Sequence, residues 1–194
     1  MSTMGATPAR AGAAGEQDPS RTGMLVFIMS EAVLFTNLIA AYLYLRFSAV
    51  HWFPGDVLPL YLGLPAANTI ILLSSSIPVH WATLSIQRGN RRNLIIGLAL
   101  TFIMGAIFIG GQAYEWTHAG FTPQGSVFGS TFFTLTGFHG AHVLVGLTFL
   151  AVTLVRALRG RFTAEHHFAV QAAGWYWHFV DAVWVFLFGS LYLL

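Results

Sequence analysis

The chain has 194 residues, of which 56% are hydrophobic and only 8% are charged. A water-soluble domain has about a quarter of its residues charged, so these side chains cannot cover a water-facing surface and indicate an integral membrane protein. There is no cysteine, which excludes disulfides, thiolate metal sites and cysteine nucleophiles. The basic residues are all arginine and lie beside apolar stretches, not in the basic stripe that nucleic-acid binding requires.

The first 21 residues are rich in alanine, glycine, proline and serine and contain no apolar run. We therefore expect residues 1–21 to form a mobile tail and not a signal peptide. A helix needs about 20 largely apolar residues to cross a bilayer. Five stretches within residues 22–194 meet this length, namely 24–47, 59–86, 94–116, 127–155 and 168–193. The predicted fold is an all-α membrane domain with five transmembrane helices.

The arginines predict the orientation of these helices. When loops are assigned alternately to two sides, only Arg46 falls on one side. All other arginines fall on the opposite side: Arg10, Arg21, Arg88, Arg91, Arg92, Arg156, Arg159 and Arg161. Cytoplasmic loops carry the excess of arginine, so we expect the N-terminus inside and the C-terminus outside.

Several ionisable residues fall inside the predicted helices: Glu31, His80, His139, His142, His178 and Asp181. Such groups are costly in hydrocarbon, so each should face a neighbouring helix or a polar cavity. Glu31 lies about eight residues into the first helix, or roughly 12 Å along its axis. A carboxyl at that depth should be protonated or paired. It could handle protons or simply hydrogen-bond to another helix, and both interpretations stay open.

The fourth helix carries two histidines in the segment "TGFHGAHVLVG". His139 and His142 are three residues apart and share a face, while Gly137 and Ala141 are small enough for another helix to approach closely. Two histidines on one helix cannot ligate opposite faces of one haem, and a zinc or copper ion would need further ligands. We therefore favour imidazoles that hydrogen-bond across a tight helix contact.

The last helix contains the segment "GWYWHFVDAVWVF". His178 and Asp181 share one face, so the carboxylate can hold the imidazole in one tautomer. Trp177, Asp181 and Trp184 form a stripe at spacings of four and three residues, which is typical of helix packing. We favour a structural pair, although a histidine and a carboxylate in a membrane also suit a proton relay.

The second helix contains the segment "LLSSSIPVHWA". Pro78 should kink this helix, and the hydroxyls of Ser74 to Ser76 can satisfy the backbone groups that the kink frees. His80 lies near the inner end of the helix, where we expect it to reach the membrane interface.

A basic cluster is expected where the fourth helix ends, made of Arg156, Arg159, Arg161, His166 and His167. Such a cluster can follow from topology alone. It can also form a site for an anionic lipid head group, because basic pockets on this side of a membrane suit such lipids.

Two segments, "GSTFFTLTGFHGAHVLVGLTFL" and "FTAEHHFAVQAAGWYWHFVDAVWVFLF", closely resemble subunit III of haem–copper cytochrome c oxidases. Upstream, "MSEAVLFTNLIAAYLY", "LLSSSIPVHWATLSIQRGNRR" and "GGQAYEW" also fit, so the resemblance covers about residues 22–194. The chain is most similar to the short five-helix bacterial form, which lacks the first two helices of the seven-helix form. The resemblance implies a multi-pass protein of the bacterial plasma membrane.

The resemblance also implies a non-catalytic role. Subunit III carries no haem or copper, which belong to partner subunits, and it packs against subunit I in a complex with subunit II and other respiratory chains. It supports proton uptake, stabilises the active site during oxygen reduction and binds phospholipid. By the same resemblance, Glu31 matches the family's buried carboxylate. The matching interior polar positions are His139, His142, His178 and Asp181, and those near lipid head groups are Arg156, Arg159 and His166.

Other functions remain open at this point. Subunit III of a quinol oxidase and a homologue associated with nitric oxide reductase share the short form. A five-helix cytochrome b-type anchor would ligate haem through pairs drawn from His80, His139, His142 and His178. A proton-conducting subunit would require Glu31 for every turnover.

Overall fold

The computed structural model describes residues 19–49, 52 and 62–194. Its helices are α1 (Pro19–Ser48), α2 (Gly63–Ser74), α3 (Ser76–Gln87), α4 (Arg91–His118), α5 (Val127–Leu158) and α6 (Phe168–Phe188), followed by a π-helical turn η1 (Gly189–Leu193). Since α2 continues into α3 and α6 into η1, the helices form five segments long and apolar enough to cross a membrane. No strand occurs in these ranges. The prediction of an all-α fold with five helices long and apolar enough to span a membrane is confirmed.

The helix ends lie within a few residues of the predicted ones, with one difference at each of the first two helices. Residues 1–18 of the expected tail and residues 59–61 of the expected second helix lie outside the described ranges. Pro19 to Arg21, which we assigned to the tail, form the first turn of α1. A proline in the first turn is compatible with a helix, because its missing N–H would have no intrahelical partner there.

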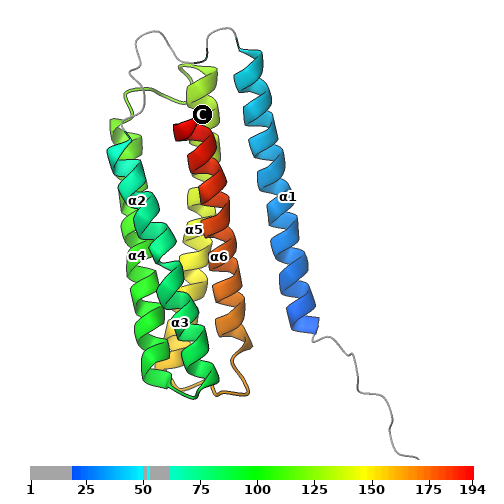
Figure 1. The fold of residues 1–194 in the computed structure, drawn as a ribbon, viewed down its shortest axis with the longest axis vertical. Helices are drawn as coiled ribbons and strands as arrows, with labels where there is room; N and C mark the ends of the chain where they lie inside the picture. Colours follow the sequence, from blue (N-terminus) through cyan, green and yellow to red (C-terminus); the bar gives the residue numbers. More distant parts are fainter. Residues whose placement is uncertain (1–18, 50–51, 53–61) are drawn as a thin grey trace, which may run out of the picture.

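The helices α2 to α6 form a bundle, and α1 stands along one side of it (Figure 1). Helix α4 packs against α2, α3 and α5, and α6 packs against α5, α3 and α2. Among the α-helices of the described ranges, α1 packs closely only against α5 and α6, and it buries just two of its residues, Phe35 and Tyr42. The core therefore belongs to α2–α6, and α1 is held at a few points.

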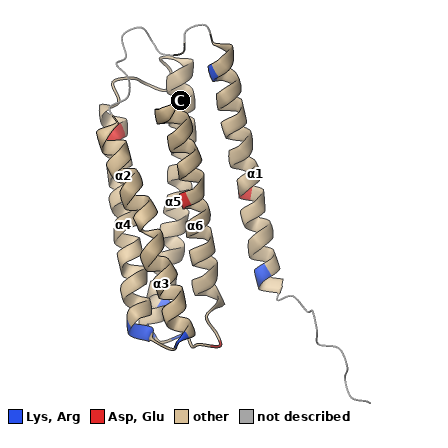
Figure 2. Ribbon diagram, in the orientation of Figure 1, with Lys and Arg blue, Asp and Glu red and all other residues tan. Residues whose placement is uncertain are grey.

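Figure 2 shows how the charged residues are distributed along the bundle. Basic residues gather at the end where α1 begins and α3 meets α4, and one lies at the opposite end of α1. Arg46, in the last turn of α1, is that residue. The distribution matches the alternation counted from the sequence, except for Arg10, which lies outside the described ranges.

The helix of the second span is interrupted where Pro78 predicts. A proline cannot donate to the carbonyl four residues earlier, here that of Ser74, and α2 ends at this residue while α3 begins at Ser76. The Ser75 hydroxyl between them donates to the Leu72 carbonyl at 2.6 Å, and the Ser74 hydroxyl donates to the Ile70 carbonyl at 2.7 Å. These two hydroxyls bond to carbonyls one turn back and not to the Ser74 carbonyl that Pro78 frees, and the Ser76 hydroxyl bonds to Asp181. The expectation that the serines satisfy the freed backbone group is therefore wrong for the described residues.

Arg91 joins the start of α4 to the end of α5. Its Nε donates to the Ala157 carbonyl at 2.9 Å, and a terminal nitrogen donates to the Leu158 carbonyl. The last carbonyls of a helix lack intrahelical partners and carry partial negative charge. A guanidinium there donates hydrogen bonds to these carbonyls and offsets their charge.

We expect Arg91→Ala to lower the free energy of unfolding by about 1–2 kcal/mol, through loss of these charge-assisted bonds. Thermal unfolding of the purified protein in detergent measures this. Arg92→Ala is the matched control, because Arg92 is exposed and makes no hydrogen bond to another described residue. Equal melting temperatures for the two variants would contradict the assignment.

Candidate functional site: paired polar groups inside the bundle

Glu31 of α1 and His142 of α5 form an ion pair or hydrogen bond at the boundary between these helices. The distance between Glu31 Oε2 and His142 Nε2 is 2.9 Å, and the side chains are 23% and 16% exposed, respectively. The other ring nitrogen, Nδ1, lies 2.7 Å from the Phe138 carbonyl. A carbonyl can only accept, so Nδ1 carries a proton. One further proton is then shared between Nε2 and the carboxyl, whichever of the two formally holds it.

Aromatic groups surround this pair. The Phe35 ring meets the His142 ring edge to face at 4.7 Å between centroids, and the Tyr176 hydroxyl donates to the His142 carbonyl at 3.3 Å. The expectation that His142 hydrogen-bonds across a helix contact is confirmed. The sequence did not identify Glu31 as its partner, because the two residues are 111 positions apart.

Ser76 of α3 lies between His178 and Asp181 of α6. Its hydroxyl oxygen is 3.0 Å from His178 Nδ1 and also contacts Asp181 Oδ2 as a hydrogen-bond donor. With Asp181 ionised, the hydroxyl proton goes to the carboxylate, and Nδ1 of His178 then donates to the serine oxygen. The carboxylate therefore orients the imidazole through Ser76. No direct ion pair joins His178 to Asp181 in the described part of the chain.

Two tryptophans of α6 also bond to hydroxyls of the second span. Trp177 Nε1 donates to Ser75 Oγ at 2.8 Å, and Trp184 Nε1 donates to Thr69 Oγ1 at 2.9 Å. Both indoles are fully buried. The tryptophan stripe therefore packs between helices, as its spacing predicted. The bonds of Trp177, Asp181 and Trp184 hold α6 against the second span at three successive points along the helix.

His139 differs from His142 although both were expected to hydrogen-bond. Its side chain is fully buried between Phe108 and Trp184, with ring centroids 5.8 and 4.7 Å away. Neither ring nitrogen has a hydrogen-bond partner among the described residues. The expectation is wrong for His139, because its side of α5 faces aromatic rings of α4 and α6 while His142 faces α1.

A second carboxyl, Glu115, also bonds to another helix segment. Its two oxygens accept from the Tyr192 hydroxyl of η1 at 2.8 Å and from Gln112 Nε2 at 2.9 Å.

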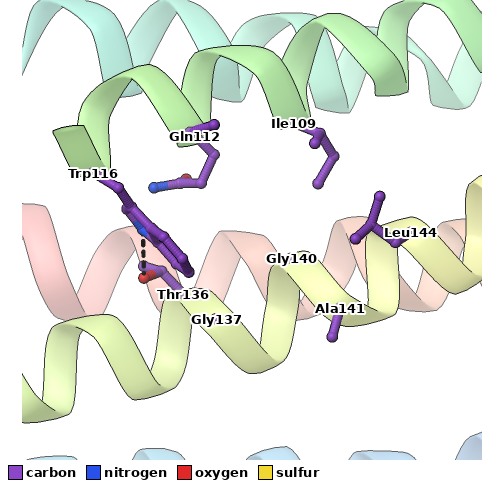
Figure 3. Close-up of a pocket in the computed structure, with 9 residues that line it drawn as sticks. Ile109, Gln112, Trp116, Thr136, Gly137, Gly140, Ala141 and Leu144 are labelled. Carbon is purple, nitrogen blue, oxygen red and sulfur yellow. Dashed lines mark hydrogen bonds between the residues drawn. The ribbon is translucent and has the colours of Figure 1, made fainter.

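A groove of about 240 Å³ lies between α4 and α5. Figure 3 shows Gln112 beside it and the hydrogen bond from Trp116 to Thr136 across it. The groove is lined by Ile109, Gln112, Ala113, Trp116, Thr136, Gly137, Gly140, Ala141 and Leu144. The small residues that predicted a close helix approach, Gly137 and Ala141, thus line a groove.

The expected lipid-binding residues lie at the arginine-rich end of the bundle. Arg156, Arg159 and His166 are all exposed, and the Arg156 guanidinium lies over the Phe162 ring at 5.1 Å. Glu165 is a fully exposed neighbour of His166. Hydrogen bonds from its own backbone N–H and from Thr163 lower the pKa of this carboxyl, which therefore stays ionised beside the cationic groups.

Comparison with known proteins identifies the family. The sequence profile described as cytochrome c oxidase subunit III matches residues 11–194. The chain is 42% identical to cytochrome c oxidase subunit 3 of Loxodonta africana over 182 residues, covering 91% of this chain and 70% of that protein. It is 45% identical to the Sus scrofa protein and 46% identical to the Gallus gallus protein, each over 178 residues that cover 89% of this chain and 68% of the relative. The chain, with its five apolar spanning helices, therefore belongs to the cytochrome c oxidase subunit III family.

Proposed function

We propose that the chain is a non-catalytic accessory subunit of an aerobic terminal oxidase, packed against subunit I. Family membership implies a complex with other oxidase subunits. The observation that supports an accessory role is the use of the polar groups inside the spans. Glu31 bonds to His142, Asp181 to Ser76, and Glu115 to Tyr192, so each carboxyl joins two helix segments. Carboxyls that are used to join helices support a structural role for this chain and not a catalytic one.

The Glu31–His142 pair supports an auxiliary role in proton uptake. The pair shares one proton, and both side chains are partly exposed at the edge of α1. Such a pair can take up a second proton and release it again while keeping one hydrogen bond between the helices. We propose that it buffers protons for subunit I without being an obligatory step of the reaction.

The arginine-rich end supports the orientation and a lipid site. We place this end, with the N-terminus, in the bacterial cytoplasm, because arginine is enriched in cytoplasmic loops. Arg156, Arg159 and His166 there offer exposed cationic groups to a phospholipid phosphate. The neighbouring Glu165 carboxylate opposes anion binding, which makes the two guanidiniums the main attraction.

Purification through this chain in mild detergent tests the proposal. We expect a large haem-bearing subunit and phospholipid to co-purify, as seen in the haem spectrum and by mass spectrometry. A Soret band that persists after the other subunits are stripped would instead make the chain a haem-binding anchor. Reduction by cytochrome c or by quinol then distinguishes the two kinds of oxidase.

Glu31→Gln is expected to leave oxygen consumption largely intact. The amide can still bond to His142, but it cannot release a proton, so we expect a shorter active lifetime during turnover. Initial rate and its decay, measured with an oxygen electrode, separate these effects. Glu115→Gln is the control, because it changes a carboxyl elsewhere in a span. Abolished turnover at normal subunit yield would show that Glu31 is an obligatory proton carrier.

A further inference from the structure

A polar seam lies on the outer surface where α3 meets α6. It consists of His80 and Ser76 of α3 and His178 of α6, and the centroids of the two imidazole rings are 6.4 Å apart. His80 is exposed and His178 is partly exposed. His80 lies seven residues before the end of α3, and His178 lies ten residues after the start of α6, which correspond to roughly 10 and 15 Å of helix. The hydrocarbon core is about 30 Å thick, so His178 lies at membrane depth. His80, which we expected to reach the interface, lies about 10 Å of helix inside the end of its span.

The seam has unused hydrogen-bonding capacity. His80 makes no hydrogen bond to any other residue that the structure describes. His178 uses Nδ1 for its bond to Ser76, so Nε2 is the ring nitrogen that remains for a partner. Behind it, Asp181 is only 4% exposed, and its Oδ1 has no partner within the described ranges.

Acyl chains cannot satisfy these groups, because hydrocarbon neither donates nor accepts hydrogen bonds. The seam is flanked by apolar side chains that lipid would suit, such as Ile77, which is 71% exposed, and Val185, which is 48% exposed. A polar row inside an apolar helix surface is typical of contacts between transmembrane helices, where side chains hydrogen-bond across the interface. The chemistry therefore favours a protein helix over lipid.

Building on the proposed function, we propose that the α3–α6 polar seam is where this subunit docks a transmembrane helix of a partner oxidase chain. That helix must present a hydrogen-bonding side chain, such as a hydroxyl or an amide, to His178 Nε2. His80, on the neighbouring helix α3, would then hydrogen-bond to a second polar side chain of the same partner helix. The contact would satisfy at membrane depth the groups that this chain leaves open.

Site-specific photo-crosslinking in the intact oxidase tests the seam. The photoreactive amino acid p-benzoylphenylalanine would replace Ile77 of α3 or Val185 of α6, which flank the seam. The control position is Ile103 of α4, an isoleucine 53% exposed on an apolar surface. After irradiation in native membranes, we expect adducts to another oxidase chain from positions 77 and 185, and adducts to lipid alone from position 103.

Other outcomes would overturn the inference. Lipid adducts alone, an adduct of twice this chain's mass, or a crosslink to residues 1–18 of the same chain would each give the seam a different occupant. Because two flanking positions are used, the test still gives a result if one of the two variants fails to assemble. If the haem-bearing subunit does not co-purify at all, the proposed function fails. If it co-purifies but crosslinks only from position 103, the proposed function stands and the seam is not its interface.

Discussion

Replacing Gly105 by alanine is expected to destabilise the bundle, because no space exists there for one methyl group. A Cβ at Gly105 would lie 2.5 Å from Cη2 of Trp177 and 2.9 Å from a methyl carbon of Leu147. The indole cannot easily move away. Its Cε3 atom meets Gly146 of α5, where a Cβ would lie 2.9 Å away, and its nitrogen is bonded to Ser75.

Overpacking of this kind costs about 1–3 kcal/mol, whereas glycine to alanine in a helix normally gains up to about 1 kcal/mol. We therefore expect Gly105→Ala to lower the melting temperature of the protein in detergent. The matched control is Gly110→Ala in the same helix, where no atom lies within 4 Å of the new Cβ. That variant should be neutral or slightly stabilised. Equal behaviour of the two variants would show that the Trp177 ring is free to shift.

The helices themselves were predictable from the sequence because length and apolar composition determine them locally. Each of the five predicted stretches overlaps one observed span, and the interruption near Pro78 was also expected. Which side of a helix faces which neighbour is not a local property. His139 and His142 are three residues apart, yet one meets two aromatic rings and the other meets a carboxyl.

The contacts that define the site were missed for the same reason. Ser76 appeared only as part of a serine run beside a kink, but it lies between His178 and Asp181, 102 and 105 positions away. The slot for Trp177 combines glycines of α4 and α5, which no spacing rule relates to α6. A pattern on one helix indicates that a polar or small residue needs a partner, and only the packing of the helices shows which one.

Helix α1 illustrates how polar contacts replace apolar burial in this fold. It buries only Phe35 and Tyr42. Near its end, the Tyr42 hydroxyl donates to the Ser190 carbonyl at 2.8 Å, and Arg46 donates to the carbonyl of Leu194. At mid-length, Glu31 bonds to His142. Hydrogen bonds near the end and at mid-length therefore hold α1 against the bundle, although α1 buries little of its apolar surface there.

We expect His142→Leu to weaken this attachment by about 1–3 kcal/mol, because it leaves the Glu31 carboxyl without a partner at membrane depth. Replacing both residues by leucine should recover most of the loss, since two apolar groups leave nothing unsatisfied. A double-mutant cycle with Glu31→Leu should give a coupling energy of about 0.5–3 kcal/mol, the range for residues in contact or in one hydrogen-bond network. Unfolding in detergent with increasing denaturant, followed by tryptophan fluorescence, measures all four proteins.

Strictly additive effects would contradict this account, because they would mean that the two side chains do not interact. The double-leucine variant also separates the two roles proposed for the pair. It removes the shared proton while keeping α1 attached, so any change in its turnover lifetime cannot come from loss of the helix. A lifetime as short as that of Glu31→Gln would assign the effect to the proton, whereas a normal lifetime would leave the pair with a structural role alone.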